Sequence, residues 1–131
     1  MLSAELRLIY ETAVYEAKFQ SGVVRFRVAA APEGRLAAQT LAIVTAWNAG
    51  ELRPERAVNE RANAKLAEEL ANMGKQVFPA SGRDVAGMHV EPSFAVVDIS
   101  REEAVRLGRR YAQAAVFFWD GYEAAILSCL D

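Results

Sequence analysis

The side chains with the clearest capacity for chemistry are amides and hydroxyls between residues 45 and 63. Thr45-Ala46-Trp47-Asn48 follows an apolar run, and Asn59, Arg61 and Asn63 come soon after it. On a helical projection Asn59 falls inside an apolar stripe and Asn63 lies at its edge, so both amides should point toward the interior. An amide in that position can bind a ligand or satisfy the protein's own backbone, because buried polar groups are hydrogen-bonded.

Three later polar side chains, Glu91, Ser93 and Gln113, open or precede two further predicted strands. If these strand ends lie beside the first segment, a carboxylate, hydroxyls and amides converge on one pocket. The predicted pocket residues are Thr45, Asn48, Asn59, Asn63, Glu91, Ser93 and Gln113. Glu91 would be the general base of such a site, because it is the carboxylate of the set. Arg61 projects on a different helix face from Asn59 and would reach solvent or an anion at the helix start.

The same amides also have a purely structural interpretation. They could bond the exposed backbone of the loop from Asn48 to Pro54 and fix that loop against the following helix. Residue spacing alone does not separate a binding site from such a scaffold.

The sequence provides no pattern for a metal or a cofactor. His89 is the one histidine and Cys129 the one cysteine, too few for the usual nitrogen and sulfur ligand sets. Ser81-Gly82-Arg83-Asp84 lacks the spacing of a phosphate-binding loop, and no G-x-S-x-G nucleophile motif is present. We therefore predict neither a bound metal nor a cofactor.

The composition indicates a single globular domain. The chain has 131 residues, of which 53% are apolar and 24% are charged, and a domain of this size can bury an ordinary core. A lone cysteine is typical of a cytoplasmic protein rather than of a secreted disulfide scaffold. The longest apolar run, Ala114 to Trp119, is too short to cross a bilayer. The net charge of −2 provides no general attraction for nucleic acid, which would have to bind a local patch.

The first half of the chain predicts a helix capped by Ser3, a hairpin, a central strand and a long helix. The alternation of Val14 to Phe19 and of Val24 to Val28 predicts a hairpin with one solvated face. The continuous apolar run from Leu41 to Trp47 predicts a strand covered on both faces. No breaker interrupts the helical pattern from Pro54 to Gly74. Its predicted apolar stripe contains Val58, Ala62, Leu66, Leu70 and Met73.

The next segment predicts two strands and a helix. Gln76 to Phe78 is a short strand candidate, and the turn formers from Pro79 to Gly87 predict a mobile loop. A further strand is predicted around Glu91 to Asp98. Ser100 to Glu103 is a capping box that opens a helix.

A closing hairpin completes the chain. Ala114 to Trp119 and Tyr122 to Cys129 flank Asp120-Gly121, a pair favoured by type I′ turns. Hairpins at both ends with helices between strands predict an α+β domain with a mostly antiparallel sheet and about three helices packed mainly on one face. The exposed edges of such a sheet could pair across a two-fold axis, so a homodimer is one hypothesis.

Four short motifs occur in a fixed order along the chain. They are Thr45-Ala46-Trp47-Asn48, Asn59-x-Arg61-x-Asn63, Glu91-x-Ser93 and Gln113-x-Ala115. This arrangement resembles the bacterial domain-of-unknown-function family 3293, and the resemblance covers most of the chain from about Tyr10 to the final hairpin. It implies that the polar residues are a hallmark of the family. It implies no activity, because none is assigned to the family.

Two functional hypotheses place a site in the predicted pocket. The first is a non-catalytic cytosolic binding or regulatory domain, whose polar pocket after Trp47 takes a small molecule or a protein partner. The second is a small hydrolase or nucleotide-modifying enzyme that uses Glu91 as general base. In that enzyme Asn48, Asn59 and Gln113 would orient the substrate.

A third hypothesis is a nucleic-acid-binding module. Arg25 and Arg27 on the first hairpin would combine with the helix end from Arg106 to Arg110. Binding of this kind would weaken steeply with added salt.

Overall fold

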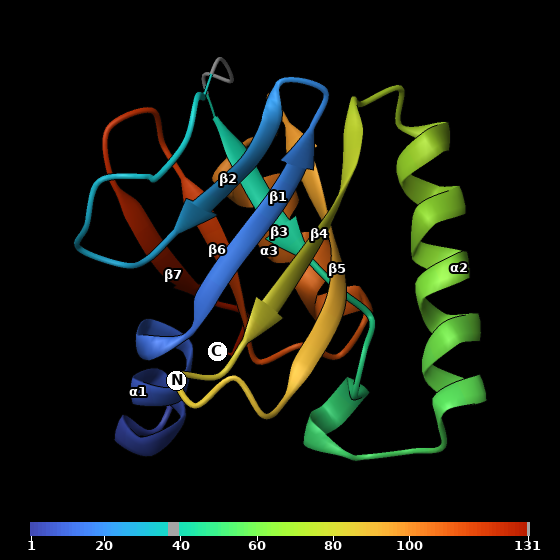
Figure 1. The fold of residues 1–131 in the computed structure, drawn as a ribbon. Helices are drawn as coiled ribbons and strands as arrows, with labels where there is room; N and C mark the ends of the chain where they lie inside the picture. Colours follow the sequence, from blue (N-terminus) through green and yellow to red (C-terminus); the bar gives the residue numbers. More distant parts are fainter. Residues whose placement is uncertain (37–39, 131) are drawn as a thin grey trace.

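The computed structural model describes residues 1–36 and 40–130, and within them the chain forms one curled sheet with three α-helices (Figure 1). The strands are β1 (Val14–Phe19), β2 (Gly22–Phe26), β3 (Leu41–Val44), β4 (Val77–Arg83), β5 (Val90–Val97), β6 (Ala115–Trp119) and β7 (Ala124–Ser128). The helices are α1 (Ala4–Thr12), α2 (Arg56–Asn72) and α3 (Arg101–Arg110), with a short 3-10 helix, η1 (Ala49–Glu51). The α+β architecture predicted from the sequence is confirmed.

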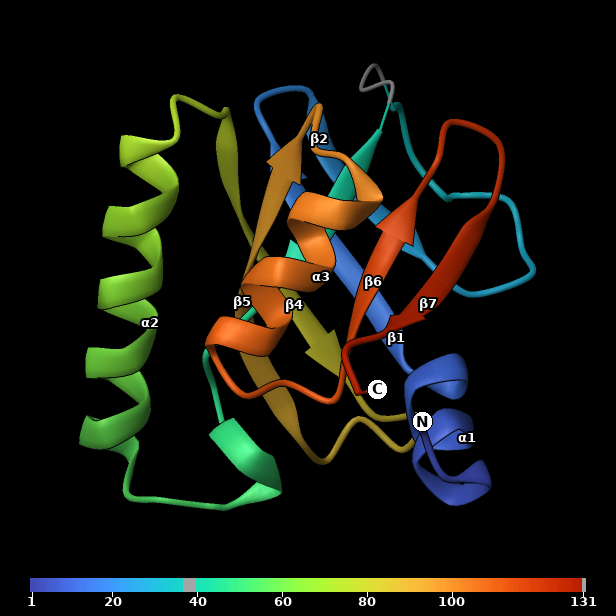
Figure 2. The ribbon, with the colours of Figure 1, turned by 180° about the vertical axis from the view of Figure 1, so that it is seen from behind.

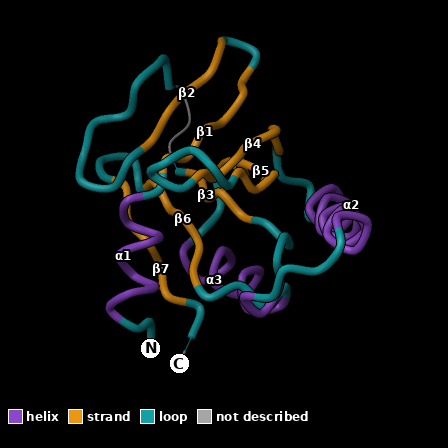
Figure 3. Tube along the Cα trace, turned by 60° about the horizontal axis from the view of Figure 1, so that its bottom comes forward, coloured by secondary structure: helices purple, strands orange, loops and turns teal. Residues whose placement is uncertain are grey.

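The sheet is antiparallel throughout the described residues, with the strand order β2-β1-β4-β5-β3-β6-β7. Three strands separate β1 from β6 in that order, yet the ring centroids of Tyr15 and Phe117 lie 4.7 Å apart. The ring of Phe26 on β2 also lies 5.2 Å from that of Phe117. These contacts require the sheet to curl, and Figure 3 shows the resulting half-barrel.

Side-chain alternation divides the core into an inner and an outer layer. On β3, Leu41 and Ile43 belong to the aromatic inner layer, whereas Ala42 and Val44 belong to the outer layer. All four β3 residues are buried, as predicted for a strand covered on both faces. β3 pairs with both β5 and β6, which confirms its predicted central place.

Helices α2 and α3 pack on the outer layer (Figure 2). Leu66 and Leu70 of α2 and Leu107 of α3 are buried there. α1 instead lies at one end of the inner layer, against which Leu6 and Tyr10 pack. No helix in the described ranges is long and apolar enough to cross a membrane.

The apolar stripe of α2 is shorter than predicted. Val58 is 43% exposed, whereas Asn59 and Asn63 are buried. The first turns of α2 therefore face the sheet with amides, and apolar packing starts with Ala62 and Leu66. These turns lie against the polar segment that follows β3, where the two amides accept from the backbone N–H groups of Ala46 and Asn48.

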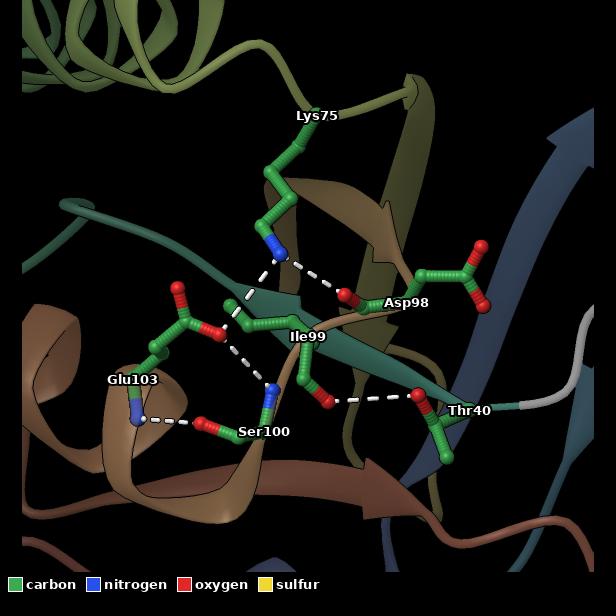
Figure 4. Close-up of polar contacts among 6 residues, drawn as sticks. All are labelled: Thr40, Lys75, Asp98, Ile99, Ser100 and Glu103. Atoms are coloured by element: carbon green, nitrogen blue, oxygen red, sulfur yellow. Dashed lines mark hydrogen bonds and ion pairs between the residues drawn. The ribbon is translucent and has the colours of Figure 1, made fainter.

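The predicted capping box at the start of α3 is confirmed (Figure 4). Ser100 Oγ accepts from Glu103 N, and Ser100 N donates to Glu103 Oε1, each at 3.1 Å. Lys75 Nζ lies 3.6 Å from the same carboxylate oxygen and donates to Asp98 O at 2.8 Å. These contacts tie the segment after α2 to the start of α3. The backbone hydrogen bond from Ser100 holds the pKa of Glu103 below its ordinary value.

The largest departure from the sequence prediction is β4. The short strand predicted over Gln76 to Phe78 is present but longer, because β4 runs from Val77 to Arg83 and pairs with both β1 and β5. The mobile loop predicted over Pro79 to Gly87 is therefore wrong up to Arg83, and of that range only residues 84–87 lie outside the strands. Gly82 is a strand residue that pairs with Tyr15, whose ring lies against it. Pairing on both sides outweighs the local turn preference of proline and glycine.

The closing hairpin is confirmed, but its turn is longer than the predicted two-residue turn. Residues 120–123 join β6 to β7. Asp120 Oδ1 accepts from the backbone N–H groups of Glu123 and Tyr122, both at 2.8 Å. These bonds hold the pKa of Asp120 below its ordinary value and stabilise the longer connection.

Candidate functional site

Part of the predicted polar set lies at the end of the half-barrel that carries α1, η1 and the start of β5 (Figure 1). A small cavity of about 60 Å³ is present there. It is lined by Tyr10, Trp47, Asn48, Glu51, Leu52, Arg53, Glu91 and Gln113. Three predicted residues, Asn48, Glu91 and Gln113, therefore share one cavity.

Asn63 and Thr45 form a structural junction and do not line the cavity. Asn63 Oδ1 accepts from Ala46 N at 2.8 Å, and Asn63 Nδ2 donates to Pro92 O at 2.9 Å. The Thr45 hydroxyl donates to the same carbonyl at 2.8 Å and accepts from Trp47 N at 3.0 Å. Both side chains thus satisfy backbone where β3 ends and β5 begins. For these two residues the structural interpretation fits the geometry.

Two other predicted residues also lie outside the cavity lining. Ser93 is buried, and its hydroxyl donates to Glu91 O at 3.0 Å. Arg61 is exposed on α2, away from the face that carries Asn59. The geometry brings neither side chain to the cavity.

Asn59 fixes the side chain of Asn48. Asn59 Oδ1 accepts from Asn48 N at 2.8 Å, and Asn59 Nδ2 donates to Asn48 Oδ1 at 2.9 Å. These bonds hold Asn48 in the left-handed conformation, with φ 52° and ψ 48°, which asparagine tolerates better than most residues. Asn48 Nδ2 then donates to Glu91 Oε2 at 3.2 Å. Asn59 is therefore a positioning residue that directs Asn48 toward Glu91.

Gln113 brings a second amide to the cavity and is only 7% exposed. Its Nε2 donates to Trp47 O at 3.1 Å and to Tyr111 O at 3.2 Å, so both amide hydrogens are used. Within the described ranges, no donor is hydrogen-bonded to Gln113 Oε1. The side chain therefore retains one acceptor.

Tyr10 and Glu51 complete the site, and the sequence did not predict them. Tyr10 Oη donates to Glu51 Oε1 at 3.4 Å, which links α1 to η1. Burial, and then the nearby carboxylates of Glu51 and Glu91, raise the pKa of Tyr10. Tyr10 lies among the apolar residues of α1 that pack on the inner layer, so nothing in its helix distinguishes it. Glu51 stands in a loop, where no periodic pattern distinguishes it.

Trp47 ends the predicted central strand, but it does not lie fully in the core. It is half-buried and lines the cavity, and the guanidinium carbon of Arg56 lies 6.0 Å from its ring centroid. Trp119, by contrast, is buried in the inner layer. In the described part of the chain, no group of three His, Cys, Asp or Glu side chains is arranged to hold a metal ion.

Glu91 is half-buried, and its burial raises the pKa of its carboxyl group above the ordinary value. The hydrogen bond from Asn48 opposes this shift, and the Glu51 carboxylate adds to it. Arg53 and His89 oppose it through their charges. The net direction favours the protonated form relative to a solvated glutamate. Such a carboxyl group suits either proton transfer or pairing with a cation.

Glu91→Gln is expected to flatten part of the pH dependence of stability. A group whose pKa is raised in the folded state contributes stability that is complete below its unfolded pKa and is lost as pH rises through its folded pKa. As the pH rises above about 4, the ordinary range of a glutamate, the unfolding free energy of the parent should therefore fall more than that of the variant. Urea unfolding at several pH values measures this difference. Glu68→Gln, on the exposed side of α2, is the control, and parallel curves for the parent and Glu91→Gln would contradict the assignment.

Comparison with known proteins identifies a family. Residues 44–116 match the family described as protein of unknown function DUF3293. No significant match was found among curated proteins or among solved structures. The matched range includes every predicted pocket residue from Thr45 to Gln113 and excludes Tyr10. Because this match covers more than half of the 131 residues, the chain belongs to the DUF3293 family of proteins of unknown function.

Proposed function

We propose that this protein is a non-catalytic binding domain whose cavity holds a small polar group of a ligand or a partner protein. One observation carries the proposal. Asn59 uses both ends of its amide to hold Asn48 in a left-handed conformation, with Asn48 Nδ2 on Glu91. A network that served only as a scaffold would end on backbone, as that of Asn63 does, whereas this one ends on a carboxylate at a cavity.

Two hydrogen-bond acceptors at the cavity remain available to a ligand, which supports a binding function. Glu91 Oε1 and Gln113 Oε1 accept from no donor in the part of the chain that the structure describes. The cavity of about 60 Å³ is far smaller than the roughly 300–1,000 Å³ of pockets that enclose whole ligands. It therefore suits one functional group, with the rest of the ligand outside.

A small hydrolase or nucleotide-modifying enzyme is the second candidate. It is favoured by Glu91, because a half-buried carboxyl group with a raised pKa beside an amide suits a general base. Binding is preferred because the chain offers little as a nucleophile at this end. Cys129 is buried, and burial raises the pKa of its thiol to about 11.

The nucleic-acid hypothesis gains less support from the geometry. Arg25 Nε lies 2.9 Å from Glu16 Oε2, and Arg110 pairs with Glu69. Two of the predicted phosphate contacts therefore already face carboxylates, which weakens their attraction for an anionic backbone.

A thermal-shift screen against metabolites and nucleotides tests the binding function. A compound in the cavity should stabilise the parent by about 2.7 kcal/mol when present at about 100 times its Kd. Asn48→Gly should lose this shift, because glycine keeps the left-handed backbone and removes the amide. Asn72→Ala, at the exposed end of α2, should keep it.

Three other outcomes are informative. A shift that survives in Asn48→Gly would locate binding elsewhere and contradict the proposal. A screen in which no compound shifts the parent would also count against it. Chemical turnover of a bound compound, abolished in Glu91→Gln, would favour the enzyme candidate.

A further inference from the structure

We infer that the cavity recognises a protonated primary amine carried on an aliphatic stem. The inference rests on the proposed function, because it names the chemical group that the same cavity binds. The acceptors available to such a group come from three separate elements of the fold. Glu91 lies on β5, Glu51 lies on η1, and Gln113 follows α3.

The cavity lining carries the acceptors of two carboxylates and the Gln113 amide, together with the guanidinium of Arg53. Glu51 and Glu91 contribute carboxylate oxygens, whereas Tyr10 already donates its hydroxyl hydrogen to Glu51. Asn48 Nδ2 donates to Glu91. An alkylammonium group has three N–H donors and no acceptor. Its hydrogen-bonding needs therefore complement those of the cavity wall.

Gln113 points to a ligand independently of the carboxylates. The side chain is only 7% exposed, and Nε2 is anchored to two backbone carbonyls. This anchoring leaves Oε1 as an acceptor without a donor from the described residues. This oxygen can therefore accept from a ligand that brings a donor into the cavity.

The charges around the cavity also favour a cation. Two carboxylates, of Glu51 and Glu91, line it together with one guanidinium, of Arg53. Burial disfavours the ionised form of Glu91, and the Glu51 carboxylate acts in the same direction. A bound ammonium group would relieve both effects, because an opposite charge nearby favours the ionised carboxylate.

The surroundings of the cavity match an aliphatic stem. Leu52 is 68% exposed and Trp47 is half-buried, and both line the cavity. A methylene chain that leaves the cavity would cover these two side chains while its charged head stays among the polar ones. The small volume admits a primary ammonium group more readily than a bulkier cationic head.

Titration of the ¹⁵N-labelled full chain with n-butylammonium chloride tests the inference. The side-chain amide signals of Asn48 and Gln113 are followed by NMR, and both should shift saturably. At equal ionic strength, n-butanol and sodium butyrate should leave them unchanged, because neither carries an ammonium group. Tetramethylammonium chloride should also leave them unchanged, because it has no N–H donor.

Charge-removing variants locate the binding. Glu91→Gln and Glu51→Gln should each weaken butylammonium binding by about tenfold or more, as expected for the loss of one charge-assisted hydrogen bond. Glu68→Gln, exposed on α2, should bind like the parent. Backbone amide signals far from the cavity show whether each variant remains folded.

The outcomes separate this inference from the proposed function. Equal binding of butylammonium and tetramethylammonium, or unchanged affinity in Glu91→Gln, would overturn recognition of a primary amine. Shifts produced by butyrate or butanol alone would overturn it while leaving a binding cavity in place. If none of the four compounds shifts the side-chain amide signals, the inference is overturned as well. The metabolite screen would then decide the proposed function separately.

Discussion

Asn63→Ala is expected to lower the free energy of unfolding by about 2–4 kcal/mol. The substitution removes the acceptor that lies 2.8 Å from Ala46 N, a donor in a residue that is 1% exposed. Pro92 O loses the amide donor but keeps the hydroxyl of Thr45. The larger share of the loss therefore comes from the unpaired Ala46 N–H. Urea unfolding followed by tryptophan fluorescence measures the change.

Two further substitutions show whether the Asn63 amide is the cause. Asn72→Ala changes an exposed asparagine of the same helix and should stay within about 0.5 kcal/mol of the parent. Asn63→Asp keeps an acceptor for Ala46 N but can donate to Pro92 O only when protonated. Its stability relative to the parent should therefore improve as the pH falls. A loss in Asn63→Ala no larger than that in Asn72→Ala would contradict the structural role.

Elements whose local patterns agree with their surroundings could be predicted from the sequence. The capping box from Ser100 to Glu103 defines the start of α3 by contacts within one turn. The apolar run at Leu41 predicts a buried central strand, because only a strand with both faces covered tolerates it. β4 could not be predicted in this way. Pro79 and Gly82 favour a turn locally, and the strand forms through pairing with β1 and β5, which are distant in sequence.

The site was predictable only where a residue conflicts with the pattern of its own element. Asn59 and Gln113 are polar residues at buried positions, and this conflict identified them as candidate site residues. Tyr10 fits the apolar face of α1, and Glu51 fits a loop, so neither conflicts with anything local. Their meeting depends on how α1 lies at the end of the curled sheet and on a contact that spans 41 positions.

Asn63 and Asn59 belong to neighbouring hydrogen-bond networks, but Asn63 has a structural role and Asn59 positions a residue of the candidate site. Asn63 bonds only to the protein's own end of β3 and start of β5. One helical turn earlier, Asn59 makes the same kind of bond to the Asn48 backbone, but its second bond fixes the Asn48 side chain. The sequence predicts only that both amides point toward the interior, because their different roles depend on which residues each amide contacts in the fold.

Gly108→Ala is expected to destabilise the protein by about 1–3 kcal/mol through overpacking, although helix propensity alone predicts about 1 kcal/mol of stabilisation. Gly108 is buried in α3. A Cβ there would lie 2.3 Å from Cys129 Sγ and 2.9 Å from Val116 Cγ1. Both distances are well inside van der Waals contact, so α3 would have to move away from β6. The sign of the change in a urea titration decides which effect dominates.

Cys129→Ala tests the cause of that loss in a double-mutant cycle. It removes the closest obstacle, so Gly108→Ala should cost less in this background, and Val116 should keep the rescue partial. Strict additivity of the two changes would contradict the steric explanation. Because α3 leads directly into Gln113, a displaced helix should also disturb its bond to Trp47 O. The side-chain amide signal of Gln113 should therefore shift in Gly108→Ala and return toward the parent position when Cys129 is also replaced, which would connect helix packing to the cavity.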